Sequence, residues 1–312
     1  MRAAELPIFF RHIESELCSV PNELRRLFHG RGRCWQGLEQ LTCDWLQGQL
    51  VVNVFKEPEP EFINELKAGL IEFSSSAVWR DKHGRTIVLQ HRYQDGAPTE
   101  VLVGELDTTP IVEENDIRYQ LDVGRNQNFG LFLDMRYGRE WVKKHAQNKR
   151  VLNLFAYTCG FSLAAISGGA KHVVNLDMAK ASLNKGRQNH RVNKHDMSKV
   201  SFLAHDLFKS WGKLKKLGPY DLIIIDPPSF QKGSFALTKD YQKILRRLPD
   251  MLTANGEVLA CVNSPAVREQ FLIDSMKEQA PEIILKQRLD NPPEFKDIDN
   301  QSSLKAMVFG IR

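Results

Sequence analysis

The sequence has no uninterrupted run of eighteen apolar residues, so we expect no membrane-spanning helix and no membrane partner. Its beginning carries acids and a histidine where a secretory signal needs an apolar core, and we therefore expect a cytoplasmic protein. Its five cysteines form no Cys-x-x-Cys pair, and no histidine-rich cluster accompanies them. This argues against a zinc site and against a disulfide framework, so we also expect no metal.

A GxGxxG fingerprint is missing too, which argues against the usual glycine-rich cradle for a dinucleotide pyrophosphate. What is present is an ordinary globular composition: 312 residues, of which 42% are hydrophobic and 26% are charged. A chain of this length favours two domains or one large domain.

Positive charge is concentrated in one stretch of the chain. The formal net charge is +5, but residues 139–216 alone hold sixteen Lys or Arg against four Asp or Glu. A basic segment of this density is typical of proteins that bind a polyanion such as RNA. The alternative is a set of ordinary solvated helix faces, and charge alone leaves both readings open.

Residues 1–121 mix helical and strand periodicity, which predicts a small α+β domain. The expected elements are a helix in 1–30 that restarts as a second short helix at Glu23–Phe28, two strands in 38–55, a helix at 58–70 and short strands in 77–106. No chemistry-bearing motif is present here. Recognition of an RNA substrate is one interpretation of this domain, and a structural cap or dimerisation unit is the other.

Residues 122–312 alternate between short apolar strands and amphipathic helices, which predicts an α/β fold with a doubly wound, mainly parallel sheet. Strands are expected near 151–155, 172–176, 200–203, 222–225, 257–262, 283–289 and 304–311. Ligands of such sheets bind beyond the carboxyl ends of the strands. The informative residues should therefore follow strands.

Small residues follow the first of these strands. Ala156, Thr158, Cys159 and Gly160 form a turn before a helix, and small side chains allow close approach of a ligand to a helix N-terminus. Taken alone this signal is weak.

Acidic residues follow the next two strands. Asp177 stands where an acid accepts hydrogen bonds from ribose hydroxyls, although it could instead cap the helix that starts near Ala179. Asp206 could meet an adenine amino group or act as an N-cap, and the sequence does not choose between them.

The strongest motif is Asp226-Pro227-Pro228, at the mouth of an apolar strand. Two prolines fix φ, remove two donors and hold the backbone extended. Asp226 and the Pro227 carbonyl are thereby left as rigid acceptors, and Phe230 adds an aromatic face. Acceptors beside an aromatic plane suit a planar nitrogenous substrate such as a nucleobase.

These motifs together resemble class I S-adenosylmethionine-dependent methyltransferases, and in particular the bacterial large-subunit rRNA methyltransferase I and K family. The resemblance runs from about Gly124 to Arg312, with weaker similarity back to Gln36. It rests on the stretches 126–136, 153–158, 176–178 and 226–230 and on the asparagine-rich helix that ends at Asn193. It implies a seven-stranded Rossmann-like methyltransferase sheet for 122–312.

The resemblance also implies S-adenosylmethionine as the cofactor. The stretch 126–136 would fold over it, with Asp134 or Arg136 fixing its carboxylate or amine, while the first turn would hold its methionine moiety. Asp177 would hold the ribose and Asp206 the adenine side. The residues expected to bind the cofactor are Phe132, Asp134, Arg136, Asn153, Phe155, Ala156, Tyr157, Thr158, Gly160, Asp177, Met178, Asp206, Leu207 and Asp226.

The target base would be received by Asp226, Pro227, Pro228 and Phe230, the expected catalytic residues. Two departures from the family pattern stand out: Cys159 replaces a usual glycine, and Asn263 occupies the position of the nucleophilic cysteine of cytosine-modifying members. Cys261 lies two residues earlier and is interpreted as a core residue.

The resemblance therefore implies an RNA methyltransferase that acts on a base nitrogen in large-subunit rRNA, with RNA as partner and a homodimer left open. One alternative is a cytosine carbon-5 enzyme that uses Cys261 as nucleophile. Others are a non-catalytic RNA- or cofactor-binding protein and a methyltransferase of protein side-chain amides, whose motif more often begins with Asn.

Overall fold

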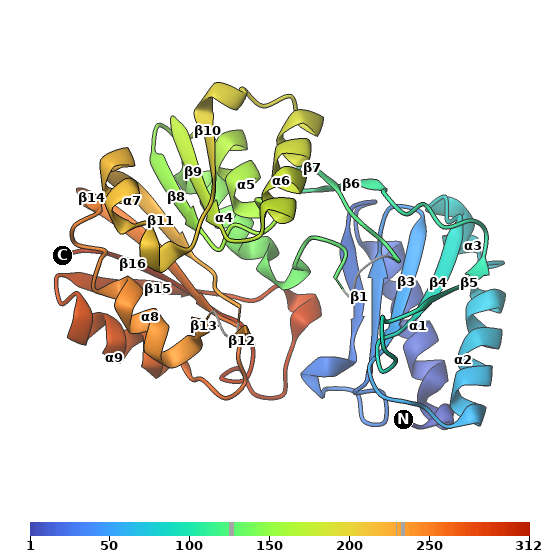
Figure 1. The fold of residues 1–312 in the computed structure, drawn as a ribbon. Helices are drawn as coiled ribbons and strands as arrows, with labels where there is room; N and C mark the ends of the chain where they lie inside the picture. The colour runs from blue at the N-terminus through green and yellow to red at the C-terminus, as the bar shows by residue number, and fades with distance from the viewer. Residues whose placement is uncertain (125–127, 229, 232–234) are drawn as a thin grey trace. The chain divides into compact units, whose positions relative to one another are not determined.

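The computed structural model describes residues 1–124, 128–228, 230–231 and 235–312. The chain divides into two compact units (Figure 1). The first unit comprises Met1–Leu133 and Pro292–Asp299, and the second comprises Asp134–Asn291 and Asn300–Arg312. The sequence placed one boundary at 121/122, and it gave no sign that 292–299 would join the N-terminal unit.

The first unit contains a five-stranded sheet in the order β1-β2-β3-β4-β5. Only β3 and β4 are parallel, and the other neighbours are antiparallel. Three helices pack their apolar residues on one face of this sheet. The elements are α1 (Leu6–Ser19), β1 (Arg25–His29), β2 (Leu41–Trp45), β3 (Gln49–Val54), α2 (Pro60–Phe73), α3 (Ala77–Asp81), β4 (Thr86–His91), β5 (Thr99–Val103) and the hairpin β6 (Ile111–Glu114) and β7 (Ile117–Gln120).

Two expectations for this unit are wrong. The short helix expected at Glu23–Phe28 is instead strand β1, because six residues cannot hold a helix against the pairing of Arg25 with Trp45 across the sheet. The strands expected from residue 77 begin only at β4, because Ala77–Asp81 forms helix α3. The Ser76 hydroxyl caps that helix, accepting the Trp79 amide at 3.2 Å.

The second unit is built on the seven-stranded sheet that the resemblance implied, in the order β10-β9-β8-β11-β14-β16-β15. β16 runs antiparallel to both of its neighbours, and the other pairs are parallel. The strands are β8 (Arg150–Leu154), β9 (His172–Asp177), β10 (Val200–Ala204), β11 (Tyr220–Ile225), β14 (Leu252–Val262), β15 (Ile283–Leu289) and β16 (Lys305–Ile311), with the short pair β12 (Phe230–Gln231) and β13 (Phe235–Ala236) beside them in the chain. The fold class is therefore confirmed.

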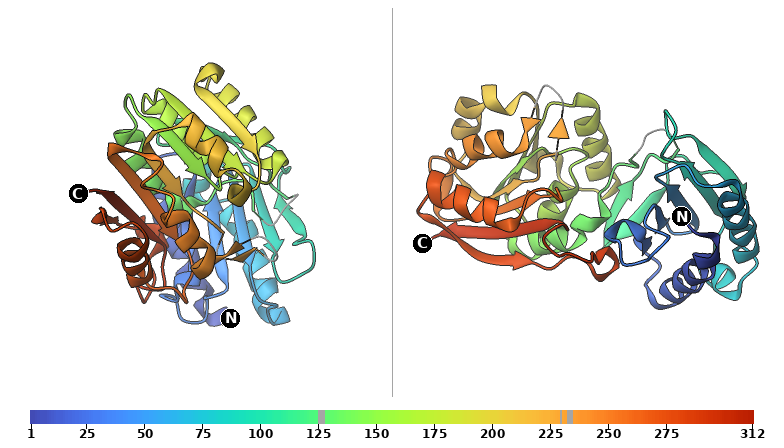
Figure 2. Two further views of the ribbon diagram at one scale, coloured as in Figure 1. Left: turned by 60° about the vertical axis from the view of Figure 1, so that its left-hand side comes forward. Right: turned by 90° about the horizontal axis from the view of Figure 1, so that it is seen from below.

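Helices cover both faces of this sheet, as Figures 1 and 2 show. α5 (Gly160–Ser167) and α6 (Lys180–Val192) lie on one face, with α4 (Arg136–His145) packed on α5. α7 (Trp211–Leu217), α8 (Leu237–Leu245) and α9 (Glu269–Gln279) share a core with the other face. The basic segment 139–216 consequently contributes to helices on both faces of the sheet.

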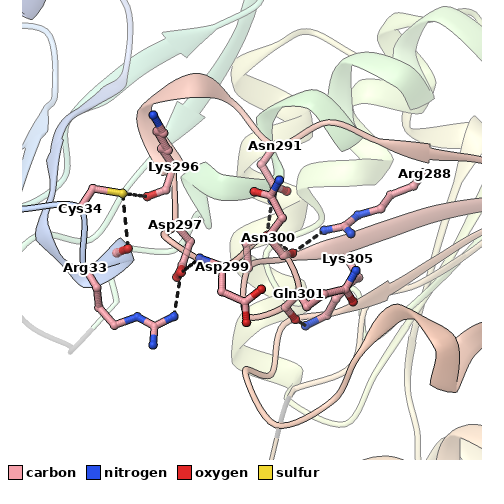
Figure 3. Close-up of polar contacts among 12 residues, drawn as sticks. Arg33, Cys34, Arg288, Asn291, Lys296, Asp297, Asp299, Asn300, Gln301 and Lys305 are labelled. Atoms are coloured by element: carbon pink, nitrogen blue, oxygen red, sulfur yellow. Dashed lines mark hydrogen bonds and ion pairs between the residues drawn. The ribbon is translucent and has the colours of Figure 1, made fainter.

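The segment 292–299 leaves the second unit between β15 and β16 and belongs to the first unit (Figure 3). There the Asp297 carboxylate accepts from the Arg33 guanidinium at 2.8 Å, and the Gly32 carbonyl accepts the Ile298 amide at 2.9 Å. On return to the second unit, Arg288 donates to the Asn300 carbonyl at 2.8 Å. Hydrogen bonds therefore anchor this connection, the first part to the first unit and the last part to the second unit.

Candidate active site

The carboxyl ends of four parallel strands line one edge of the seven-stranded sheet. Cross-strand registers place Ile225 beside Leu154, Leu154 beside Leu176 and Asp177 beside Ala204. The strand order reverses between β8 and β11, and ligand sites of open α/β sheets lie at such a switch point. The residues that follow β8, β9, β10 and β11 therefore share one edge, as the sequence predicted.

The turn after β8 has an unusual backbone. Phe155, Tyr157 and Cys159 have φ values of +55°, +47° and +67°, a left-handed conformation that costs side-chain-bearing residues about 1–3 kcal/mol each. Alternating left-handed residues turn successive amides toward one concave side, an arrangement that binds anions and polar groups. The conformation also explains the glycine usual at position 159 in the family that the sequence resembles.

The Asp177 carboxylate ties this turn to β9. One oxygen accepts the Tyr157 amide and the other accepts the Ala179 amide, each at 2.8 Å. Asp177 is not the N-cap of α6, since that position is Ala179. Each carboxylate oxygen keeps a second lone pair, so these two acceptors fit two further hydroxyl donors such as those of a ribose.

Asp206 has the capping role that the sequence left open. Its carboxylate accepts the Phe208 amide at 2.8 Å and caps a short 3-10 turn, and it also lies 3.8 Å from the Lys209 ammonium. Leu207 is buried, whereas Met178 is 55% exposed after β9. Met178 therefore exposes more apolar surface at the edge than Leu207 does.

Asn153 does not point to the carboxyl edge. Its side chain is buried and donates to the Asn175 amide oxygen at 2.9 Å, and Asn175 in turn donates to the Ser162 hydroxyl at 2.9 Å. The chain of bonds continues to His190 on α6 at 3.0 Å, and burial lowers the pKa of that imidazole to about 3. Asn153 therefore fastens β8 and β9 to their covering helices.

Asp226 follows β11 and meets charged residues that no local pattern indicated. Burial raises the pKa of its carboxyl to about 7, the Asp134 carboxylate adds to the rise, and the Arg139 guanidinium opposes it. Asp134 is itself oriented by Asn263, whose amide donates to it at 2.8 Å. Pro227 is buried beside Asp226 and Pro228 is exposed.

Cys261 lies in the core, as the sequence analysis interpreted it. Its side chain is 0% exposed, and burial raises the pKa of its thiol, with the carboxylates of Asp226 and Asp134 adding to the effect. A neutral buried thiol is a poor nucleophile. The carbonyl of Cys261 accepts a hydrogen bond from the Tyr241 hydroxyl at 3.1 Å, which fixes the end of β14.

Three expected residues lie around the start of α4. Arg136 is the first residue of that helix, with its guanidinium 4.7 Å from the Tyr137 ring centroid. Asp134 opens the second unit, whereas Phe132 belongs to the first unit and is 46% exposed.

Some of the expected residues are not described. Asn126 and Gln127 of the stretch 126–136, and Ser229 of the Pro-Pro motif, lie outside the described residues. The backbone of Phe230 begins β12, which pairs with β13.

Arg139, the side-chain role of Asn263 and Lys305 escaped the sequence reasoning. Lys305 is 0% exposed, and its ammonium donates to the Ser264 carbonyl at 2.8 Å. It also donates to the Gln301 carbonyl at 3.0 Å (Figure 3). It thereby holds the segment that follows β14. A lysine that opens an otherwise apolar strand was the available signal. Within the described residues, no group of three or more His, Cys, Asp or Glu could hold a metal ion, and no helix has the length and apolar character to cross a membrane.

The switch-point edge has an acid after the second strand and a strained turn after the first, which is where doubly wound α/β proteins bind nucleotide cofactors. A family model described as S-adenosylmethionine-dependent methyltransferase matches residues 25–310, so the chain belongs to that family. The resemblance found in the sequence is confirmed, and with it the family's cofactor, S-adenosylmethionine.

Individual relatives agree with this assignment. Ribosomal RNA large subunit methyltransferase I of Aeromonas salmonicida (strain A449) is 37% identical over 187 residues, covering 58% of this chain and 47% of that protein. YwbD of Bacillus subtilis (strain 168), a candidate ribosomal RNA large subunit methyltransferase, is 30% identical over 285 residues, covering 88% and 70%. The chain spans about half the length of the Aeromonas relative.

A solved structure shows the same fold. A candidate S-adenosylmethionine-dependent methyltransferase from Streptococcus mutans superposes with a TM-score of 0.85 at 23% identity, covering 100% of this chain and 83% of that chain.

A first prediction concerns the packing of α6 against the strained turn. A Cβ added to Gly186 would lie 2.3 Å from the Cys159 sulfur and 2.9 Å from its Cβ. Gly186→Ala should therefore lower the free energy of unfolding by about 1–3 kcal/mol, although alanine is the better helix former. Cys159→Gly removes both obstacles and suits φ +67°, so the double variant should regain most of the loss. Denaturant unfolding of all four proteins measures this, and additive effects would contradict the contact.

A second prediction uses the raised pKa of Asp226. The folded protein binds this proton more tightly than the unfolded chain, whose aspartates titrate near about 4. The stabilisation is complete below that pH and is lost as the pH rises through about 7. Asp226→Asn should therefore flatten the fall in unfolding free energy between pH 5 and pH 8. The exposed control Asp95→Asn should keep the wild-type slope, and parallel curves for wild type and Asp226→Asn would refute the prediction.

Proposed function

We propose that this chain transfers a methyl group from S-adenosylmethionine to a base nitrogen of large-subunit ribosomal RNA. The observation that carries the proposal is the convergence, at one sheet edge, of the turn bound by Asp177 and of the Asp226-Pro227-Pro228 motif. Family membership supports the methyl transfer, and the names of the Aeromonas and Bacillus relatives support the RNA substrate.

The residues present suit the cofactor. In this proposal the free lone pairs of Asp177 accept from the ribose hydroxyls, and the turn 155–160 presents its amides to the methionine moiety. Asp134 or Arg136 binds the amino-acid end, and Asp206 lies on the adenine side. When bound, the cofactor supplies a methyl group on a positively charged sulfur and needs no metal for activation.

The protein's own contribution is to place and orient the base. Asp226 and the Pro227 carbonyl accept hydrogen bonds from the base and point the nitrogen lone pair along the line of transfer. The prolines offer no competing donors and limit backbone adjustment. Phe230 is the proposed stacking partner. Arg139 lowers the pKa of Asp226 and so favours the ionised form, which accepts hydrogen bonds. Any further cationic group that binds nearby would act in the same direction.

The first unit is proposed to recognise RNA, and the cytoplasm is the proposed location. Nothing observed favours the alternative in which Cys261 attacks a cytosine, because that thiol is buried and its pKa is raised. Methylation of a protein amide fits less well, because Asp rather than Asn begins the Pro-Pro motif. A homodimer stays a prediction that sedimentation measurements would test.

A third prediction tests the cofactor site. Asp177→Ala should weaken S-adenosylmethionine binding at least about tenfold, because each hydrogen bond to a charged group contributes about 1.5–3 kcal/mol. Asp196→Ala is the matched control, since the Asp196 carboxylate also accepts a backbone amide, that of Ser198, in a turn before a neighbouring strand. Titration calorimetry on folded protein measures both affinities. An Asp177→Ala protein with wild-type affinity would remove Asp177 from the site.

A fourth prediction tests the chemistry. Asp226→Ala should abolish transfer of tritium from labelled cofactor into ribosomal RNA of a deletion strain, while cofactor binding stays largely intact. Cys261→Ala should retain activity, provided that its thermal midpoint shows that the cavity left behind is tolerated. Nucleoside analysis identifies the modified base. A covalent adduct with fluorocytosine-containing RNA would move the protein to the cytosine class.

A further inference from the structure

Two arginines of the first unit pack on one aromatic ring, and a third forms an ion pair with a buried acid nearby. We call Arg26, Arg31, Arg92, Phe55 and Asp44 the guanidinium cluster. Arg26 lies on β1 and Asp44 opposite it on β2, where the two side chains form an ion pair. Phe55 and Arg92 directly follow the parallel strands β3 and β4, whose last residues are register partners. Strand ends thus bring together residues that are far apart in the sequence.

The ring of Phe55 is a platform for two of these arginines. The guanidinium carbon of Arg31 lies 4.8 Å from the ring centroid and that of Arg92 lies 5.1 Å from it. Phe55 is held in place because its amide donates to the Gln40 carbonyl at 2.9 Å. A guanidinium that packs on a ring keeps its own plane and donors available to a further ligand.

The turn that carries Arg31 is rigid. Gly30 begins a 3-10 turn after β1, and a Cβ at this position would lie 2.0 Å from the Leu38 carbonyl oxygen. Arg31 is exposed, and its guanidinium donates to the neutral Gln40 side chain at 2.7 Å. The neighbouring Arg33 differs, since it is engaged by the Asp297 carboxylate (Figure 3). Arg31 therefore lies on a tightly packed turn, and its guanidinium is hydrogen-bonded to a neutral partner.

Charge in the cluster is not balanced. Burial lowers the pKa of Arg92, Asp44 opposes this, and the guanidinium groups of Arg26 and Arg31 lower it further. Arg92 thus lies near one carboxylate and two further guanidinium groups. His29 adds no charge at neutral pH, because burial and Arg26 lower its pKa to about 3. Gathering like charges costs free energy, and an anionic ligand would recover it.

We propose that the guanidinium cluster binds the RNA substrate, with Arg31 and Arg92 on backbone phosphate and a base stacked on the outer guanidinium plane. Planar cations beside an aromatic ring match single-stranded RNA, which offers phosphates and unstacked bases together. This inference rests on the proposed function and assigns part of its substrate recognition to the first unit. Arg26 has a structural role in this proposal, since its ion pair with Asp44 holds β1 to β2.

The test measures binding of a fluorescently labelled, single-stranded RNA of about 20 nucleotides to the full chain at several KCl concentrations. Arg31→Ala should weaken binding about tenfold and should lower the slope of log affinity against log salt by about 0.7, the value for one lost phosphate contact. Arg31→Lys should keep the slope but regain only part of the affinity, because lysine lacks the planar face. Arg11→Ala, an exposed arginine on α1, is the matched control and should bind like wild type.

Calorimetry with S-adenosylmethionine separates this inference from the proposed function. All variants should bind the cofactor as wild type does. If Arg31→Ala and Arg11→Ala both bind RNA as tightly as wild type, the cluster is not an RNA site, and the proposed methyl transfer stands. If the wild type neither binds RNA nor methylates it, both proposals fall.

Discussion

The bridge from the Tyr157 and Ala179 amides to the Asp177 carboxylate is the contact on which the candidate site depends. It joins the turn after β8 to the end of β9, so the strained backbone of the turn and the acid proposed to bind the ribose are fixed together. This bridge is one of the contacts that hold three left-handed residues in a costly conformation. The same carboxylate therefore serves structure and proposed binding, which is why the two interpretations of Asp177 are not rivals.

At the end of β11, burial and charged neighbours set the protonation of Asp226. Burial and the nearby Asp134 carboxylate raise the pKa of Asp226, Arg139 is the opposing cation, and Asn263 donates a hydrogen bond that orients Asp134. A carboxyl with a pKa near 7 can change protonation when a cationic ligand arrives, whereas an exposed one would stay ionised throughout. On the proposed substrate side, the protonation of Asp226 can thus change when a charged ligand binds. On the proposed cofactor side, the bonds of Asp177 hold the turn in place.

The positive charge of residues 139–216 is adjacent in the sequence but is carried by helices on both faces of the second unit's sheet. In the guanidinium cluster, by contrast, Arg31 and Arg92 pack on one ring. Local density of positive charge, rather than its sum along the chain, is the better guide to a phosphate-binding surface. The first unit, which carried no recognisable motif, is for this reason the stronger candidate for RNA contact.

The sequence by itself determined the doubly wound sheet, because strand and helix periods alternate regularly from residue 122 onward. It also placed Asp177 and Asp226 at strand ends, since both directly follow apolar runs. It failed at β1 and α3, short segments whose state depends on cross-strand pairing and on a single cap.

Only the tertiary structure decided that the Asn153 side chain bonds to Asn175 on the next strand and does not face the carboxyl edge. It also decided that Gly186 must leave room for Cys159 and that residues 292–299 join the first unit. It alone surrounded Asp226 with Asp134 and Arg139. These features arise from contacts between residues far apart in the chain. A periodic pattern reports which face of an element is buried, but not which distant side chain will meet it there.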